Sequence, residues 1–308
     1  MPDVVMHTVI AQNVQSALPQ EIKLKISDDP FYFASYGPDI WFLYRPWQRR
    51  QGRGRCMHTT QTGPFLMTLA KVCADSSAKD RMFSYLAGFL CHYALDSIAH
   101  PYVIWETTEV HHRKEAHRTF EHRLDMDEME KSGTFTGSHP ITSQYLLHRS
   151  LPSEMESDLN EVYRSVYGWQ NCRKALNASY RRYRALYRLM ENPRGFLSRL
   201  ARKKDTDLWR SISIPDAYFT AEEVENESHS VWKNPFSPEI ESSESFSDLF
   251  VRSKERAAEL IAASYQFIYL NEIDESALSE IIGVQSYFSG LDWKDPRNLT
   301  IPSLLPPQ

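Results

Sequence analysis

Residues 79–101 read KDRMFSYLAGFLCHYALDSIAHP, and this stretch decides the fold that the sequence predicts. Its apolar side chains recur at helical spacing, so we expect a helix over residues 78–99 that the final proline ends. His92, Asp96 and His100 follow one another at intervals of four residues. Each interval turns the chain by only about 40° around a helix, so the three side chains share one stripe.

The same spacing returns at His117 and Glu121, on a second predicted helix over residues 114–130. An imidazole and a carboxylate on adjacent turns are ligands from which helical scaffolds build zinc sites, although a single pair is usually structural. Gly88, on the stripe of the first helix, predicts open space there, and Asp125 is a candidate for orienting a ligand from behind. Eight candidate ligands within 115 residues predict a metal cluster: His7, Asp39, His58, His92, Asp96, His100, His117 and Glu121.

The remainder of the chain also predicts helices, and therefore an all-α fold. Glycines number only eleven, and alternating β-branched runs are few. Aromatic residues, prolines and glycines over residues 29–63 predict a long ordered loop, and residues 132–140 a break. Further helices are expected over residues 4–18, 20–27, 154–167, 172–190 and 250–270.

Composition excludes several classes of protein. Hydrophobic residues at 42% and charged residues at 24% are typical of a folded globular chain and not of a disordered or fibrous one. The longest apolar run, residues 85–91, is too short to span a bilayer, and the first residues lack the pattern of a secretory signal. We therefore expect a cytoplasmic protein. The four cysteines form no C-x-x-C pair, so any metal must be held by histidines and carboxylates.

Charge is distributed unevenly along the chain. Residues 173–204 contain eleven Lys and Arg against the single acid Glu191, whereas residues 205–308 contain seven basic and nineteen acidic residues. The basic segment either contacts phosphates of a lipid surface or a nucleic acid, or pairs with the acidic part of the chain. A second basic stretch, residues 40–74, contains six Lys and Arg and no acid.

The order of the candidate ligands resembles the trinuclear zinc site of the bacterial zinc-dependent phospholipase C family, whose fold is shared with P1-type nucleases. The most specific matches are GPDIW at residues 37–41 and FLCHYALDSIAHP at residues 89–101. The resemblance covers about residues 1–130. It implies a catalytic domain over residues 1–204, with residues 205–308 as a helical extension packed on it. One continuous domain is the alternative.

The resemblance also implies how two or three Zn²⁺ ions are held. The family's third site uses a terminal tryptophan, whereas Met1, or Pro2 after trimming, stands here. His111, His112, His122, His139, His148 and His229 are expected to be structural or surface residues. The implied ligand sets are Asp39, His58, His92 and Asp96 for one ion; His100, His117 and Glu121 for a second; and Asp96, His7 and the terminal amine and carbonyl for a third.

Such a site predicts hydrolysis of phosphate esters. Zinc lowers the pKa of bound water to about 7, and neighbouring ions can hold the attacking and leaving oxygens. The resemblance implies that Asp39 orients or deprotonates the attacking water. It favours a phospholipid, because Glu121 stands where the nuclease branch has Asp. Recognition of choline is not predicted, because Ile40 and Arg55 replace the family's aromatic residues.

Substrate contacts are expected from the arginine-rich loop. Arg45, Arg49 and Arg55 are candidates for binding an anionic headgroup or a polynucleotide backbone. Trp41 either walls the pocket, inserts at a lipid interface, or packs in the core. Peripheral contact with a membrane is compatible with these residues. Two alternative functions stay open, namely a P1-like nuclease or nucleotide phosphatase, and a non-catalytic, metal-stabilised binding protein.

Overall fold

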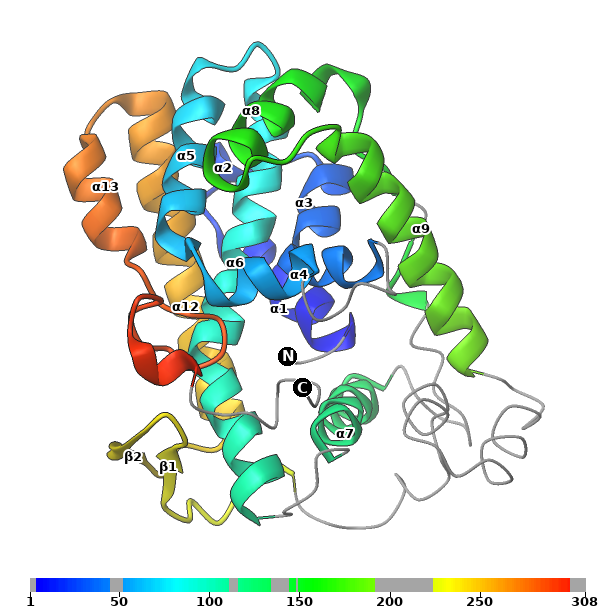
Figure 1. Cartoon of the computed structure of the whole chain (residues 1–308), viewed down its shortest axis with the longest axis vertical. Helices are drawn as coiled ribbons and strands as arrows, with labels where there is room; N and C mark the ends of the chain where they lie inside the picture. The colour runs from blue at the N-terminus through cyan, green and yellow to red at the C-terminus, as the bar shows by residue number, and fades with distance from the viewer. Residues whose placement is uncertain are drawn as a thin grey trace.

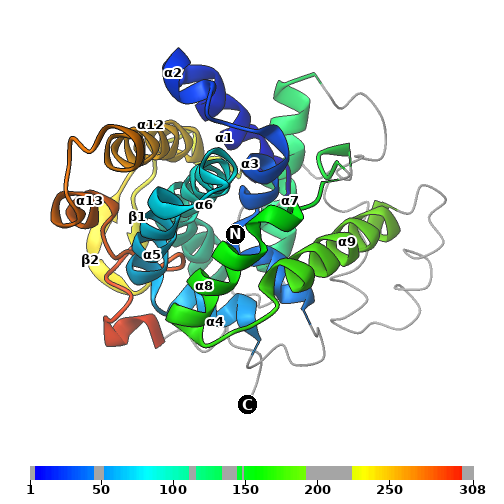
Figure 2. The same cartoon turned by 90° about the horizontal axis from the view of Figure 1, so that it is seen from above.

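The fold is built around one long central helix, α6 (Lys79–Trp105). The computed structural model describes residues 4–44, 52–110, 116–133, 144–147, 149–191 and 224–299 of the chain. Figures 1 and 2 show α6 in the middle of the molecule, with other helices on all sides. Every residue from Met82 to Asp96 is buried, as expected for a helix that is enclosed all round.

The helices that enclose α6 come from both ends of the sequence. Those that pack on it directly include α1, α3, α5 and α12. The first part of the described chain contributes α1 (Val4–Ala17), α2 (Gln20–Lys23), α3 (Asp28–Ala34), the 3-10 helix η1 (Gly37–Leu43), α4 (Arg53–Thr59) and α5 (Thr62–Asp75). Later segments contribute η3 (Glu106–Val110), α7 (Ala116–Lys131), η5 (Ser153–Met155), α8 (Glu156–Tyr167), α9 (Cys172–Glu191), α12 (Phe246–Tyr265), η7 (Gln266–Leu270), α13 (Glu275–Ile282) and η8 (Pro296–Leu299).

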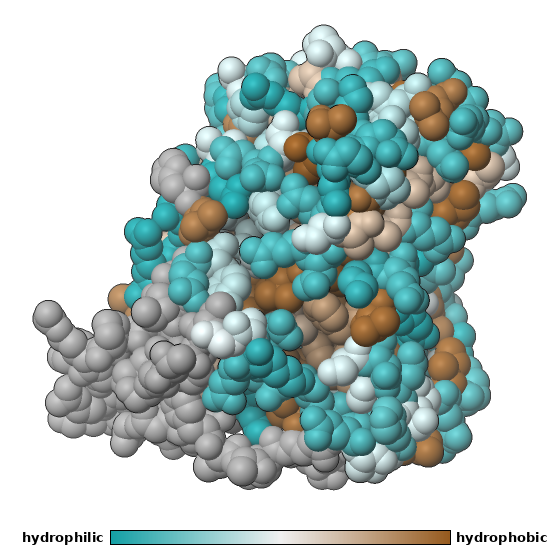
Figure 3. Space-filling model, turned by 180° about the vertical axis from the view of Figure 1, so that it is seen from behind, coloured by the Kyte–Doolittle hydropathy of each residue, from teal (hydrophilic) through white to brown (hydrophobic). Residues whose placement is uncertain are grey.

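The predicted all-α class is confirmed. Within the described residues the only sheet is an antiparallel pair, β1 (Trp232–Asn234) and β2 (Ser237–Ser242), with a bulge after Lys233. Helices predicted over residues 4–18, 114–130, 154–167, 172–190 and 250–270 are present with small differences at their ends. No helix among these residues is long and apolar enough to cross a membrane. Figure 3 shows that one face of the molecule is mostly hydrophilic, with apolar residues in small groups.

The predicted end of α6 at residue 99 is wrong, because the helix continues through Pro101 to Trp105. An interior proline costs about 3 kcal/mol, since it leaves the carbonyl four residues earlier without its N–H partner. That carbonyl, on Ser97, lies against the backbone of Gly290, where an added Cβ would be 2.6 Å from the oxygen. Beyond the proline, Tyr102, Val103 and Ile104 are fully buried. Their burial offsets the cost, at about 1.5–3 kcal/mol for each large apolar side chain.

The predicted long loop over residues 29–63 is also wrong, because α3, η1 and α4 occupy most of it. Its prolines and glycines mark helix starts. Pro30 lies in the first turn of α3, Pro38 is the second residue of η1, and Gly52 precedes α4 as its N-cap residue. Proline is tolerated in a first helical turn, where its missing N–H has no intrahelical partner to lose.

The open space predicted beside Gly88 is occupied by α3. A Cβ built at Gly88 would lie 2.0 Å from the carbonyl oxygen of Phe31, so the two backbones are in direct contact. Only glycine permits this approach. It brings the end of α3, and η1 after it, onto the face of α6 that carries His92 and Asp96.

Residues of α12 and α13 share one hydrophobic core with α6. Leu249, Leu260 and Leu278 are fully buried in the same cluster as Phe83 and Leu86. The boundary expected near residue 204 falls in residues 192–223, which lie outside the described ranges. The division at this position stays a prediction.

Candidate metal centre

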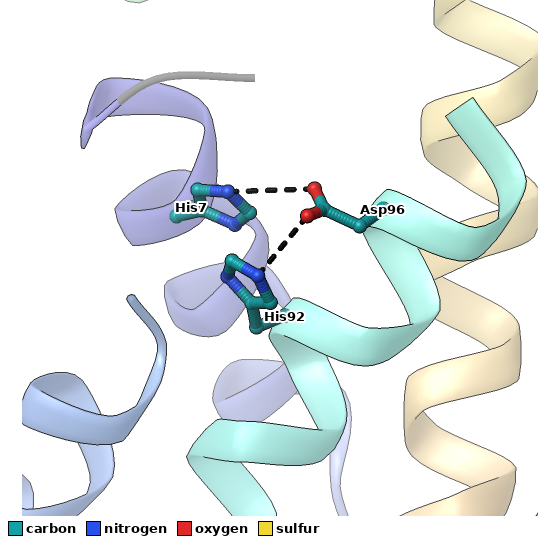
Figure 4. Close-up of side chains that lie close together, drawn as sticks. All are labelled: His7, His92 and Asp96. Carbon is teal, nitrogen blue, oxygen red and sulfur yellow. Dashed lines mark ion pairs between the residues drawn. The ribbon is translucent and has the colours of Figure 1, made fainter. Parts of the chain in front are cut away.

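The first group of candidate ligands joins α1 to α6. His7 on α1 points at Asp96, with Nε2 3.6 Å from Oδ1, and His92 approaches the other oxygen of Asp96 at 3.0 Å. Figure 4 shows the three side chains turned toward one another from two helices. The rings of His7 and His92 are stacked, with centroids 4.1 Å apart. One candidate ligand atom from each of the three residues lies within 4.8 Å of the others.

A second group shares residues with the first. It consists of Asp39 on η1, His58 on α4, and His92. The Nε2 atom of His58 lies 3.2 Å from Oδ1 of Asp39 and 3.9 Å from Oδ2 of Asp96. Asp39 also faces His7, at 3.8 Å. The two groups therefore form one continuous cluster, in which Asp96 is close to three imidazoles.

The third group lies further along α6. His100 approaches His117 of α7 with 3.2 Å between their Nε2 atoms. Glu121, one turn along α7, places Oε1 2.9 Å from His117 and 4.0 Å from His100. All eight candidate ligands predicted from the sequence thus lie in these three groups. The terminal amine predicted for a third zinc belongs to residue 1, outside the described ranges, and stays a prediction.

Backbone carbonyls orient three of the imidazoles. A carbonyl oxygen only accepts a hydrogen bond, so each of these rings must carry its proton on Nδ1 and keep a lone pair on Nε2. This is the arrangement that metal-binding histidines use. The bonds join His58 to Gly54 at 2.7 Å, His92 to Ser35 at 3.2 Å, and His100 to Tyr287 at 3.0 Å.

The ring of His117 is oriented by a side chain instead. Thr107 donates its hydroxyl hydrogen to the carbonyl of Val103 at 2.8 Å and lies 3.3 Å from Nδ1 of His117. Because the hydroxyl hydrogen is used for the carbonyl, the oxygen is left to accept from Nδ1. His117 therefore also presents Nε2 to its group.

The cluster is buried, and several of its polar atoms lack hydrogen bonds. His7, His58, His92 and Asp96 are fully buried. Both ring nitrogens of His7, Nε2 of His58 and His92, and both oxygens of Asp96 have no hydrogen-bond partner among the described residues. A buried polar atom left unsatisfied costs about 1–3 kcal/mol. A cation held between these atoms would satisfy them, so the residues fit a metal centre.

Burial also sets the protonation state that a metal requires. It lowers the pKa of His58 to about 4, and it lowers the pKa values of His7, His100 and His117 well below their usual range. For Asp96, burial raises the pKa, but interactions with the neighbouring histidines, His92 first, outweigh burial and lower the pKa. At neutral pH these four imidazoles are therefore neutral and Asp96 is ionised. These are the forms that bind metal ions.

Asp125 acts on the helix that carries His7. Its two oxygens accept hydrogen bonds from the backbone N–H groups of Val5 and Met6, each at 3.0 Å. The first N–H groups of a helix have no intrahelical acceptor, and a negative charge is favourable there. We expected Asp125 to orient a ligand side chain, whereas these bonds place it at the start of α1.

Gly37 explains the glycine of the GPDIW motif. Its φ of +45° is in the left-handed region, and a Cβ there would lie 2.5 Å from Cγ and Cδ2 of His92. Glycine is thus required both by the backbone and by the ring packed against it. Two residues later, Asp39 enters the cluster from the same turn.

Two further residues border the cluster from a distant part of the chain. Tyr287 places its ring 5.5 Å from that of His58 and 5.6 Å from that of His92. Phe288 stacks on His58 at 5.2 Å, as Phe42 does at 5.0 Å. The sequence provided no signal for Tyr287 or Phe288, because neither belongs to a ligand motif and both lie far from the histidines along the chain.

The candidate substrate-binding residues have different positions. Arg45 and Arg49 lie outside the described residues. Arg55 is partly buried on α4. Trp41 is fully buried, with its ring against those of Tyr163 and Trp169, so it packs in the core and cannot line a pocket or enter a lipid surface in this conformation. Of the histidines expected to be structural, His122 is buried, His229 is half exposed at its side chain, and the other four lie outside the described residues.

Fold and site together define a helical protein with a buried centre of histidines and carboxylates. Comparison with known families agrees, since the family model for zinc dependent phospholipase C matches residues 6–186. The chain belongs to this family. The match includes all eight candidate ligands and ends before Tyr287 and Phe288. Neither the curated proteins nor the solved structures contain a match to the chain.

Proposed function

We propose that this protein is a zinc-dependent phosphoric ester hydrolase that acts on phospholipids as a phospholipase C. The observation that carries the proposal is the convergence of Asp39, His58, His92 and Asp96 in one buried cluster, with His100 and its partners next along α6. The family to which the chain belongs supports zinc as the metal.

The residues would divide the work as follows. Zinc bound in this centre supplies an acidic water, with a pKa of about 7, and positive charge for phosphate oxygens. Asp39 would take the proton of the attacking water, since its carboxylate lies in the second group, beside His58. Asp39, Asp96 and Glu121 contribute three negative charges, which two or three divalent ions exceed. The centre therefore keeps a positive charge that attracts an anionic ester.

The surroundings favour a lipid over a nucleic acid. Phe42 and Phe288, both partly buried, stack against His58 and give the cluster an apolar border. Glu121 of the third group is a glutamate, as in the phospholipase branch that the sequence resembles, whereas the nuclease branch has Asp at this position. An apolar border also excludes water, and this strengthens electrostatic contacts to the phosphate.

The test is a substrate panel with controlled metal content. Protein purified without chelator is expected to contain two or three zinc ions and to release phosphorylated headgroup from phosphatidylinositol, phosphatidylglycerol or phosphatidylcholine vesicles. Chelation should remove the activity, and added zinc should restore it. Turnover of single-stranded DNA alone would contradict the lipid substrate. Stoichiometric zinc without turnover of any substrate, bis-p-nitrophenyl phosphate included, would point to a binding protein.

The exposed face of α9 supports contact with an anionic membrane. Lys174, Arg181 and Arg188 are exposed and spaced by seven residues, so they form one stripe on the helix. Lys174 lies 3.7 Å from Glu156, and no ion pair involves the two arginines within the described residues. The helix packs on η1, which carries Asp39. The stripe is on the exposed side of α9, so a membrane bound to it would be separated from η1 by the thickness of this helix.

Charge reversal on this stripe tests the proposal. Arg181→Glu combined with Arg188→Glu is expected to weaken binding to vesicles containing phosphatidylglycerol by about 30-fold or more, since each basic residue near an anionic surface contributes about 1 kcal/mol. Cosedimentation with vesicles measures the affinity. The control pair, Lys71→Glu with Lys294→Glu, changes net charge equally at exposed sites outside α9 and should have a much smaller effect. If both pairs of substitutions weakened vesicle binding equally, net charge alone would explain the effect, and the stripe on α9 would have no specific role.

A further inference from the structure

We propose that Tyr287 and Phe288 are positioning residues that connect the two parts of the proposed metal centre. These parts are the continuous cluster around Asp96 and the third group around His100. The inference rests on the proposed zinc centre and concerns residues beyond the part of the chain that the family model matches. These residues touch His58 and His92 of the continuous cluster and His100 of the third group. Their role is to hold these imidazoles in the orientation that zinc requires.

The contacts of Tyr287 and Phe288 with His100 are specific. The carbonyl of Tyr287 accepts the Nδ1 hydrogen of His100 at 3.0 Å, so it determines which ring nitrogen faces the group. The ring of Phe288 lies 5.1 Å from that of His100 and 5.2 Å from that of His58. One phenyl ring thus contacts ligands of two different groups.

The segment is held on α6, close to the ligands that it contacts. The Tyr93 hydroxyl bonds to Oε1 of Gln285 at 2.6 Å and accepts the backbone N–H of the same residue at 3.0 Å. Gly290 lies against the carbonyl of Ser97. Tyr93 follows His92 directly, and Ser97 follows Asp96. The same helix therefore anchors the segment and presents the ligands, so a shift of one is transmitted to the other.

The segment also has internal support. The N–H of Ser286 donates to the carbonyl of Leu291 at 2.7 Å, and the N–H of Trp293 donates to the carbonyl of Val284 at 2.9 Å. These bonds close a turn with Tyr287 and Phe288 inside it. A rigid turn holds the carbonyl of Tyr287 at one place, which an open loop would not.

Zinc affinity tests the role of the phenyl ring. Phe288→Ala is expected to weaken binding of at least one zinc ion by about 10- to 100-fold, the range typical of residues that orient metal ligands. Competition with a chromogenic chelator measures this affinity without reference to turnover. Phe288→Tyr keeps the ring and should restore affinity close to that of the wild type. Phe267→Ala, which removes another partly buried phenyl ring from η7, is the control for lost stability.

A second readout does not depend on zinc. In metal-free wild-type protein, nitrogen NMR of the imidazoles should show His100 with its proton on Nδ1, and Phe288→Ala should produce a mixture of tautomers. Unchanged tautomer and unchanged zinc affinity in Phe288→Ala would overturn the inference. An equal loss of affinity in Phe267→Ala would also overturn it, since the effect would then be general. A wild-type chain that binds no zinc but keeps the Nδ1 tautomer would overturn the zinc centre and leave the positioning of His100 supported.

Discussion

Asp96→Asn is expected to abolish turnover of bis-p-nitrophenyl phosphate and to lower zinc content. The carboxylate of Asp96 lies 3.0 Å from His92, 3.6 Å from His7 and 3.9 Å from His58, so in the proposed centre it would serve more than one metal position. An amide is a poor zinc ligand and carries no charge. The zinc affinity should fall by more than the roughly 100-fold that marks the upper range for residues behind the ligands. Elemental analysis and an activity assay on the same samples measure both effects.

The matched control for Asp96→Asn is His229→Ala. His229 is half exposed at its side chain and bonds through Nδ1 to the carbonyl of Ser243, away from the candidate ligands. Zinc content and turnover should be those of the wild type. The melting temperature of both variants in chelator separates loss of metal from loss of fold. Full zinc content with full turnover in Asp96→Asn would disprove the role given to this carboxylate.

Gly37→Ala is expected to displace His92 and lower both stability and zinc affinity. The left-handed φ of +45° costs a residue with a Cβ about 1–2 kcal/mol. The added methyl group would also lie 2.5 Å from the ring of His92, which must move. Overpacking of this kind costs a further 1–3 kcal/mol or so. Chemical denaturation gives the free energy of unfolding, and chelator competition gives the zinc affinity.

Gly168→Ala separates the two causes. Gly168 has a φ of +71° at the end of α8, and a Cβ there would meet no atom within 4 Å. Its substitution should cost only the backbone term of about 1–2 kcal/mol and leave zinc binding intact. If Gly37→Ala lowered the free energy of unfolding no more than Gly168→Ala and bound zinc normally, the packing of Gly37 on His92 would not contribute to zinc binding.

The pairs of candidate ligands on one helix were predictable because their geometry is local. Residues four apart on a helix lie on the same face whatever surrounds them, so His92 and Asp96, and likewise His117 and Glu121, could be placed together from the sequence. The same reasoning failed at Pro101 and over residues 29–63. At Pro101 the helix-breaking signal of proline was outweighed by burial of the helix beyond it. Over residues 29–63 the prolines and glycines marked the starts of helices and not a loop.

The positions of the residues around the candidate ligands depended on how the helices pack against one another, so the sequence did not predict them. Asp125 lies far along the chain from the helix start that it caps, and Gly88 is a contact with α3 and not an opening. Trp41, a candidate for binding substrate, is in the core. None of these positions follows from spacing along one helix.

The sequence by itself determined several of the helices, α6 and α7 among them, and which side chains each of these presents on one face, since helical periodicity requires only neighbouring residues. Only the tertiary structure decided that α1, η1, α4, α6 and α7 bring their candidate ligands to common groups. It also decided that the turn of Tyr287 and Phe288 closes on His58 and His100. The physical reason is that the distance between two elements is set by how their side chains and backbones fit together. A contact such as that between Gly88 and Phe31 exists only when the two helices are packed together, so it cannot be predicted from either helix alone.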